Sequence, residues 1–248
     1  MKGLFICLLL LTFGVLKAQD SSLAVRFNSS IERVSNSSNW QEHGLAVGFV
    51  KPKQFEVLAK SSFVQRFGNQ KMQYGIGGFA MLHSSVYVTS EMSFSEGGFL
   101  PKYAFASEVF KVIEKSEFSL GYRLLAFDEN IHLLSVGFSQ YWLSELTTLK
   151  VYHAKPSFTD NNLWSFIFRN RHYFNEQTYM EFGFGFGEEV SRNTESFAIT
   201  NIANRNISLG LAKSWDDLTL KLSYTLVKEE FNNNSRTRNA INLSINWR

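Results

Sequence analysis

The chain has 248 residues, a formal net charge of +3 and an aromatic content of 15%, with 24 Phe and three Pro. So balanced a charge lacks the basic footprint of a nucleic-acid-binding protein, and we expect no nucleic-acid partner. The single cysteine, Cys7, lies in an apolar run near the N-terminus. The remaining chain therefore offers no thiol for a disulfide framework or a thiolate metal site.

The first eighteen residues have the pattern of a secretory signal peptide. Lys2 gives a positive n-region, residues 4–16 form an almost unbroken apolar core, and Ala18 stands at a suitable cleavage point. The alternative, a membrane anchor, needs roughly 20 apolar residues. This core is shorter because Lys17 closes it. We therefore expect an exported protein.

Beyond this leader the chain alternates apolar and polar residues, which is the period of a β-strand with two different faces. No run approaches the roughly 18 apolar residues of a membrane-spanning helix. In the last run, four apolar residues ending at Trp247 alternate with four polar residues ending at Arg248. In chain order the predicted strands are 23–28, 44–49, 55–60, 72–77, 86–94, 103–112, 118–124, 134–142, 149–152, 164–169, 180–187, 207–215, 218–226 and 239–248.

The connections between these runs alternate in length. Those after even-numbered runs are short, and they are 51–53, 83–85, 114–116, 143–145, 175–177 and 216–217. Those after odd-numbered runs are mostly longer and more polar, with 188–202 predicted as the longest loop and 231–238 as another. Short periplasmic turns and longer outer loops are typical of outer-membrane barrels. The facing of side chains in 103–112 is ambiguous from sequence.

The tryptophans fall at the ends of the predicted strands. Four of them share parity with the apolar face, and these predicted membrane-interface residues are Trp142, Trp164, Trp215 and Trp247. Trp40 has the opposite parity. Aromatic girdles at both interfaces of a membrane barrel predict this arrangement, whereas a soluble sandwich would place tryptophans mid-strand in its core.

We therefore predict an all-β fold, an antiparallel transmembrane β-barrel of about 14 strands, with about 12 as the alternative count. The predicted organisation is a signal peptide at 1–18 and a barrel at 19–248. The expected location is the outer membrane of a Gram-negative bacterium, in contact with its lipid. Trp247 near the terminus is a candidate signal for the barrel-assembly machinery, although Arg248 departs from the pattern of ending on the aromatic itself.

One segment, 96–152, carries a series of short motifs, which are Phe99-Leu100-Pro101-Lys102-Tyr103, Gly121-Tyr122-Arg123, Phe127-Asp128, 132–137, Tyr141-Trp142 and 149–152. Through these motifs the segment resembles the YaiO-like outer-membrane proteins. The resemblance implies an outer-membrane barrel without an established activity. Some related barrels accompany the export of extracellular polysaccharide, so a saccharide solute is one expectation that follows from the resemblance.

The polar face of the predicted strands carries charged residues of both signs. The lumen-lining candidates are Arg26, Glu56, Lys60, Glu91, Arg123, Lys150, Glu181 and Lys221. One interpretation is a set of internal ion pairs that brace or plug the barrel. The other is a polar conduit whose charges select solutes, with 188–202 long enough to fold inward as a constriction.

Catalysis has weaker support in the sequence. Some outer-membrane barrels are hydrolases built on Ser-His or Asp-His pairs near the outer rim. His43 and His153 fall near that rim, but neither lies in a hydrolase motif. The glycines of 183–187 alternate with phenylalanines inside a strand, where a phosphate-binding loop cannot form. We expect no catalytic, cofactor or metal site.

Three functions therefore remain open at this stage. The first is a narrow pore or translocation barrel for small polar or saccharide solutes, which the glycine-rich, mixed-charge polar face favours. The second is a closed structural barrel that displays surface loops or scaffolds a partner. The third, with least support, is a lipid-modifying enzyme.

Overall fold

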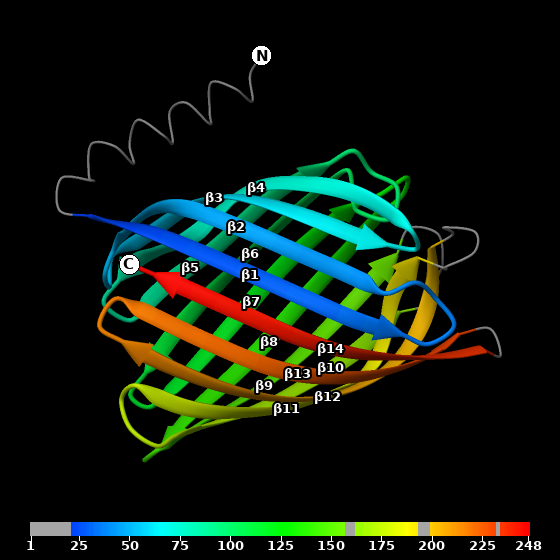
Figure 1. The fold of residues 1–248 in the computed structure, drawn as a ribbon. Helices are drawn as coiled ribbons and strands as arrows, with labels where there is room; N and C mark the ends of the chain where they lie inside the picture. The colour runs from blue at the N-terminus through cyan, green and yellow to red at the C-terminus, as the bar shows by residue number, and fades with distance from the viewer. Residues whose placement is uncertain (1–20, 157–161, 193–198, 232–233) are drawn as a thin grey trace.

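The computed structural model describes residues 21–156, 162–192, 199–231 and 234–248. These residues form one closed barrel in which every strand pairs antiparallel with its chain neighbours (Figure 1). The strands are β1 (Ser22–Val34), β2 (Trp40–Lys51), β3 (Phe55–Arg66), β4 (Asn69–His83), β5 (Val86–Ser95), β6 (Tyr103–Ile113), β7 (Ser116–Ala126), β8 (Asn130–Trp142), β9 (Glu145–Pro156), β10 (Leu163–Tyr173), β11 (Thr178–Arg192), β12 (Ile199–Trp215), β13 (Leu218–Phe231) and β14 (Asn234–Trp247).

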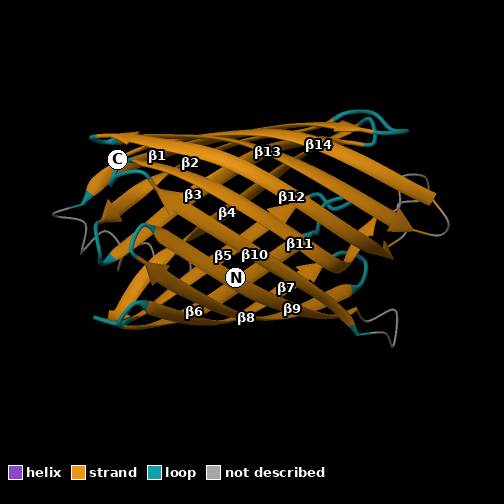
Figure 2. Ribbon diagram, turned by 90° about the horizontal axis from the view of Figure 1, so that it is seen from below, coloured by secondary structure: helices purple, strands orange, loops and turns teal. Residues whose placement is uncertain are grey.

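The predicted fold class and the larger of the two predicted strand counts are confirmed by this closed sheet of fourteen strands. The strands run obliquely around the barrel (Figure 2), as closure of a sheet requires. In the described residues, no helix is long and apolar enough to cross a membrane. The predicted signal peptide at 1–18 lies outside the described residues.

Closure depends on the pairing of the first and last strands. Partners run from Val25 opposite Trp247 to Val34 opposite Arg238, so β1 and β14 share a long antiparallel ladder. β1 begins and β14 ends at the same end of the barrel as the short turns (Figure 1). Because short turns face the periplasm in outer-membrane barrels, we call this the periplasmic end and the opposite one the outer end.

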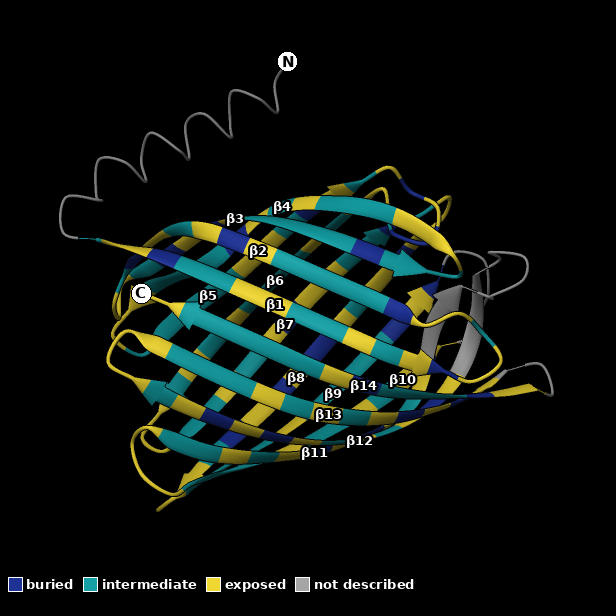
Figure 3. Cartoon of the chain, viewed as in Figure 1, coloured by how far each residue is buried: buried dark blue, intermediate teal, exposed yellow. Residues whose placement is uncertain are grey.

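The alternation of side chains gives the wall two faces. In β14, Ile241 is 58% exposed on the outward face, whereas its neighbour Ala240 is 6% exposed on the inward face. Figure 3 shows the same banding of buried and exposed residues along most strands. Large apolar side chains cover the outward face of strand after strand, as a lipid-facing surface requires. In β6, whose facing the sequence left ambiguous, Tyr103, Phe105 and Val109 are the exposed outward residues.

Two predicted loops are wrong in part. β11 and β12 pair as far as Arg192 opposite Ile199, so most of 188–202 is an extended hairpin. β13 and β14 likewise pair to Phe231 opposite Asn234, inside the predicted loop 231–238. Polar residues do not end these strands, because a hairpin that projects into water needs no apolar outward face. The central residues 193–198 and 232–233 lie outside the described part of the chain.

The tryptophans fall into an exposed group and a buried one, as expected from whether each has the parity of the apolar face of its strand. Trp142, Trp164, Trp215 and Trp247 are exposed large side chains close to strand ends. Their contact with the membrane interface remains a prediction. Trp40 is only 4% exposed, and it faces the interior at the outer end of β2.

The closing register can be tested by a cysteine pair. Asn28 and Ser244 lie directly opposite each other with side chains on the inward face. Directly paired residues are close enough for a disulfide, so N28C/S244C should cross-link the ends of the barrel. The measurement is the change in electrophoretic mobility on reduction. N28C/L243C is the matched control, because position 243 points to the opposite face. Cross-linking in the control but not in the first pair would contradict this register.

Candidate functional site

The interior of the barrel contains two adjoining cavities. The larger, of about 330 Å³, is lined by six of the predicted residues, which are Arg26, Glu56, Lys60, Glu91, Arg123 and Lys150. The second, of about 300 Å³, lies against β7 to β12. Arg123, Leu133 and Tyr152 line both cavities, so the two lie side by side and share these residues as a common wall.

Most charged residues of the larger cavity form ion pairs with one another. Arg26 pairs with Glu56. The Lys60 ammonium donates to Glu91 at 2.6 Å. Lys150 donates at 2.6 Å to Glu108, an acid that the sequence reasoning did not single out. Each pair joins strands that are not neighbours in the sheet, so the pairs brace the wall from inside.

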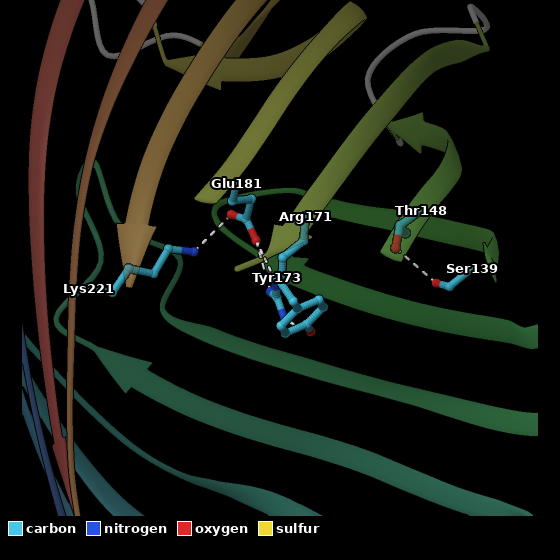
Figure 4. Close-up of polar contacts among 6 residues, drawn as sticks. All are labelled: Ser139, Thr148, Arg171, Tyr173, Glu181 and Lys221. Atoms are coloured by element: carbon cyan, nitrogen blue, oxygen red, sulfur yellow. Dashed lines mark hydrogen bonds and ion pairs between the residues drawn. The ribbon is translucent and has the colours of Figure 1, made fainter. Parts of the chain in front are cut away.

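The other two predicted residues, Glu181 and Lys221, meet in a second network. Glu181 accepts from Lys221 at 2.8 Å and from Arg171 at 2.8 Å. Arg171 also donates to the Tyr173 hydroxyl at 3.2 Å and lies 4.3 Å from the ring centre of Tyr179. Figure 4 shows Glu181 between the two cations, with strands β10, β11 and β13 supplying the three charges.

Glycines on the intervening strands leave room for these contacts. A Cβ at Gly77 would lie 3.1 Å from Lys60 Nζ and 3.3 Å from Glu91 Cβ, on the strand that this pair crosses. A Cβ at Gly210 would lie 3.5 Å from Lys221 Cε, between Glu181 and Lys221. The alternation of glycine with apolar residues therefore has a reason. The outward side chain faces lipid, and the inward position must be small.

A buried charge cluster lies at the outer end, where β1 to β3 meet β13 and β14. Arg236 donates to Glu229 at 2.5 Å, and Arg238 bridges Glu229 at 3.0 Å and Glu32 at 2.7 Å. The Trp40 ring lies beside three guanidiniums, at 4.9 Å from Arg236, 5.0 Å from Arg238 and 5.1 Å from Arg66. Sequence reasoning missed this cluster. Its one visible signal was the parity of Trp40, an aromatic on the polar face.

An apolar cluster adjoins it, and we call the two together the outer-mouth cluster. The connection after β5 folds inward, so that Phe99 and Leu100 are buried against Val64, with Phe67 packed beside them. The Phe67 ring meets Trp40 at 4.9 Å between centres. Phe67 has φ 55°, a conformation that is unfavourable for a bulky residue and that packing must hold. The connection at 96–101 therefore fills part of the interior at the outer end.

The histidines considered for catalysis lie on the outward face. His43 contacts the Ser29 hydroxyl at 2.9 Å, and His153 contacts the Asn162 side chain at 3.1 Å. Both have the parity of the exposed apolar residues of their strands. Within the described residues, no group of His, Cys, Asp and Glu could hold a metal ion. The glycines of 183–187 lie inside β11, away from any helix.

An apolar outer surface around a charged inner one defines this chain as an outer-membrane β-barrel protein. A family model described as the YaiO membrane beta barrel domain matches residues 23–190. The chain therefore belongs to the YaiO membrane β-barrel family, as the resemblance predicted, and its location is the outer membrane of a Gram-negative bacterium. No curated protein sequence matches the chain significantly.

Solved structures share the fold at low sequence identity. A bacterial polysaccharide outer membrane secretin has a TM-score of 0.57 at 10% identity, covering 91% of this chain and 98% of its own. The CymD monoaromatic hydrocarbon channel has a TM-score of 0.60 at 6% identity, covering 92% and 88%. An anion-selective porin from Comamonas acidovorans has a TM-score of 0.50 at 7% identity, covering 92% and 99%. These likenesses establish a porin-like fold.

The buried acid of the outer-mouth cluster should matter most for stability. Glu229 is 4% exposed and contacts two arginines, so E229Q removes the buried negative charge that Arg236 and Arg238 share. The expected cost is about 3 kcal/mol. E91Q is the matched control, because Glu91 is 52% exposed and its pair with Lys60 should contribute below about 1 kcal/mol. Urea unfolding in lipid vesicles measures both. Equal losses would show that burial does not distinguish the two sites.

Proposed function

We propose that the protein is a narrow outer-membrane pore or translocation barrel for small polar or saccharide solutes. The observation that supports this proposal is the pair of adjoining cavities inside the barrel, the larger of which is lined by charged side chains. Eight-stranded barrels are filled by side chains, whereas those of sixteen to eighteen strands hold an open aqueous channel. A barrel of fourteen strands lies between these limits, and a narrow passage suits its width.

In this proposal, the route for solutes at the outer end runs along one side of the barrel interior. At the outer end, the outer-mouth cluster fills the interior against β1 to β3, β13 and β14. The second cavity lies on the opposite side, against β7 to β12. We propose that solutes enter along β7 to β12 and that Phe99 and Leu100 narrow the opening. The predicted lumen-lining residues then act in two ways, because they brace the wall and also face the solute.

Conductance in planar lipid bilayers tests the proposal. Purified protein should give discrete conductance steps, and F99A/L100A should raise the unit conductance by about twofold because it removes bulk at the constriction. F94A is the matched control, since Phe94 is exposed on the outward face of β5 and its truncation should leave conductance unchanged. A barrel that carries no current, in the wild type and in F99A/L100A alike, would contradict a pore.

The outer-mouth cluster also supports a second candidate function. Its buried charges and aromatic rings close part of the interior, as in a structural barrel that displays loops or scaffolds a partner. That candidate predicts no conductance, together with stable co-purification of an envelope protein. The same bilayer recording therefore separates the two functions.

We also propose a route by which the chain reaches the membrane. A signal peptide at 1–18 would direct export, and the barrel-assembly machinery would recognise the terminal strand β14 through its aromatic end at Trp247. Support for the second step is the exposure of Trp247 on the outward face at the periplasmic end. The surrounding lipid of the outer membrane is the partner that the fold itself requires.

A further inference from the structure

The inward face of the described strands carries more cations than acids. The cations with inward parity are Arg26, Lys60, Arg66, Lys71, Arg123, Lys150, Arg169, Arg171, Lys221, Arg236 and Arg238. The acids with inward parity, among the strand residues whose side chains the structure describes, are Glu32, Glu42, Glu56, Glu91, Glu108, Glu117, Glu181 and Glu229. The interior of the described strands therefore has a positive balance, although the whole chain is close to neutral.

One of these cations, Lys71, is offset at the outer end, because it pairs at 3.2 Å with Glu96 of the connection after β5. The remaining excess arises in the middle of the barrel. The outer-mouth cluster is balanced, because three arginines face three acids there. Further in, Glu181 serves two cations, Arg171 and Lys221. Glu117 offsets part of this positive excess. Its carboxylate accepts a hydrogen bond from the Tyr87 hydroxyl at 2.7 Å, and a hydroxyl brings no positive charge to cancel it.

The guanidiniums of Arg123 and Arg169 supply most of the remaining positive charge on the inward face. Arg123 and Arg169 are exposed to the interior, and among the described residues no carboxylate lies within ion-pair distance of either. Arg169 stands opposite Gly183, where a Cβ would lie 3.4 Å from its Cγ, so the arginine passes over a position without a side chain. Arg123 borders both cavities, so a solute moving between them must pass it.

Unpaired charge in a narrow polar space determines which solutes enter. The low-dielectric wall focuses the field of these cations along the lumen, which raises the local concentration of anions. A guanidinium also matches a carboxylate with two parallel hydrogen bonds, and this geometry gives specificity beyond simple attraction. The ion pairs of the surrounding wall add little to this field, because their charges cancel at short range.

We propose that the lumen selects small organic anions, in particular carboxylate-bearing saccharides, and that Arg123 and Arg169 determine this selectivity. The proposal rests on the pore function proposed above and names its substrate class. Arg123 acts at the junction of the cavities, and Arg169 extends the positive field toward the periplasmic end of β10.

The reversal potential in a KCl gradient tests the proposal. Wild-type protein should pass chloride more readily than potassium, and R123Q/R169Q should lower the chloride-to-potassium permeability ratio by about half or more. K213Q is the matched control, because Lys213 faces outward at 5.1 Å from the Trp215 ring centre, so the ratio should not change. A cation-selective wild type, or an unchanged ratio in R123Q/R169Q, would overturn the selectivity.

A second recording tests the substrate class. Millimolar glucuronate should reduce the current through the wild type, glucose at the same concentration should not, and R123Q should remove the difference. Equal effects of the two sugars would overturn the preference for carboxylates. Absence of any current would instead contradict the pore, so the two failures are distinguishable. Retention of the heat-dependent gel shift of a folded barrel shows that each variant is folded.

Discussion

The structure depends on one constraint, that no backbone polar group can remain unpaired where lipid replaces water. The ladder between β1 and β14 meets it, because without this ladder the sheet would have two open edges inside the membrane. Pairing of residues from Val25 to Val34 with the end of the chain means that the terminal strand can close the wall only when the whole chain is present. This explains why the polar cluster at the outer end joins residues as distant in sequence as Glu32 and Arg238.

Because side chains alternate between the two sides of a strand, the two faces of the wall carry different kinds of residue. Outward positions carry mostly large apolar residues such as Leu, Phe and Trp, whereas many inward positions carry charged or small residues. Charge and small size are complementary, since Lys60 reaches Glu91 only because Gly77 leaves space between them. The interior is therefore a wall braced by ion pairs, with cavities between them that Arg123 borders.

Local pattern was enough to predict the strands, because alternation at positions such as 239–248 reports directly on which side faces lipid. The ion pairs of the interior were harder to foresee, since partners such as Glu108 and Lys150 come from strands that are not adjacent. The burial of the connection 96–101 was not foreseen. Length alone suggested that 188–202 could fold inward, whereas the apolar pair Phe99 and Leu100 was the available signal for the connection that does pack inside.

The central claim is that alternation divides the wall into a wet inner face and a lipid-covered outer face. Single cysteines from 241 to 246 in β14, introduced in a chain without the N-terminal Cys7, test it with a membrane-impermeant thiol reagent. Positions 242 and 244 should react and positions 241, 243 and 245 should be protected, since only the former face the interior. Uniform labelling along the strand, or the opposite pattern, would contradict the account.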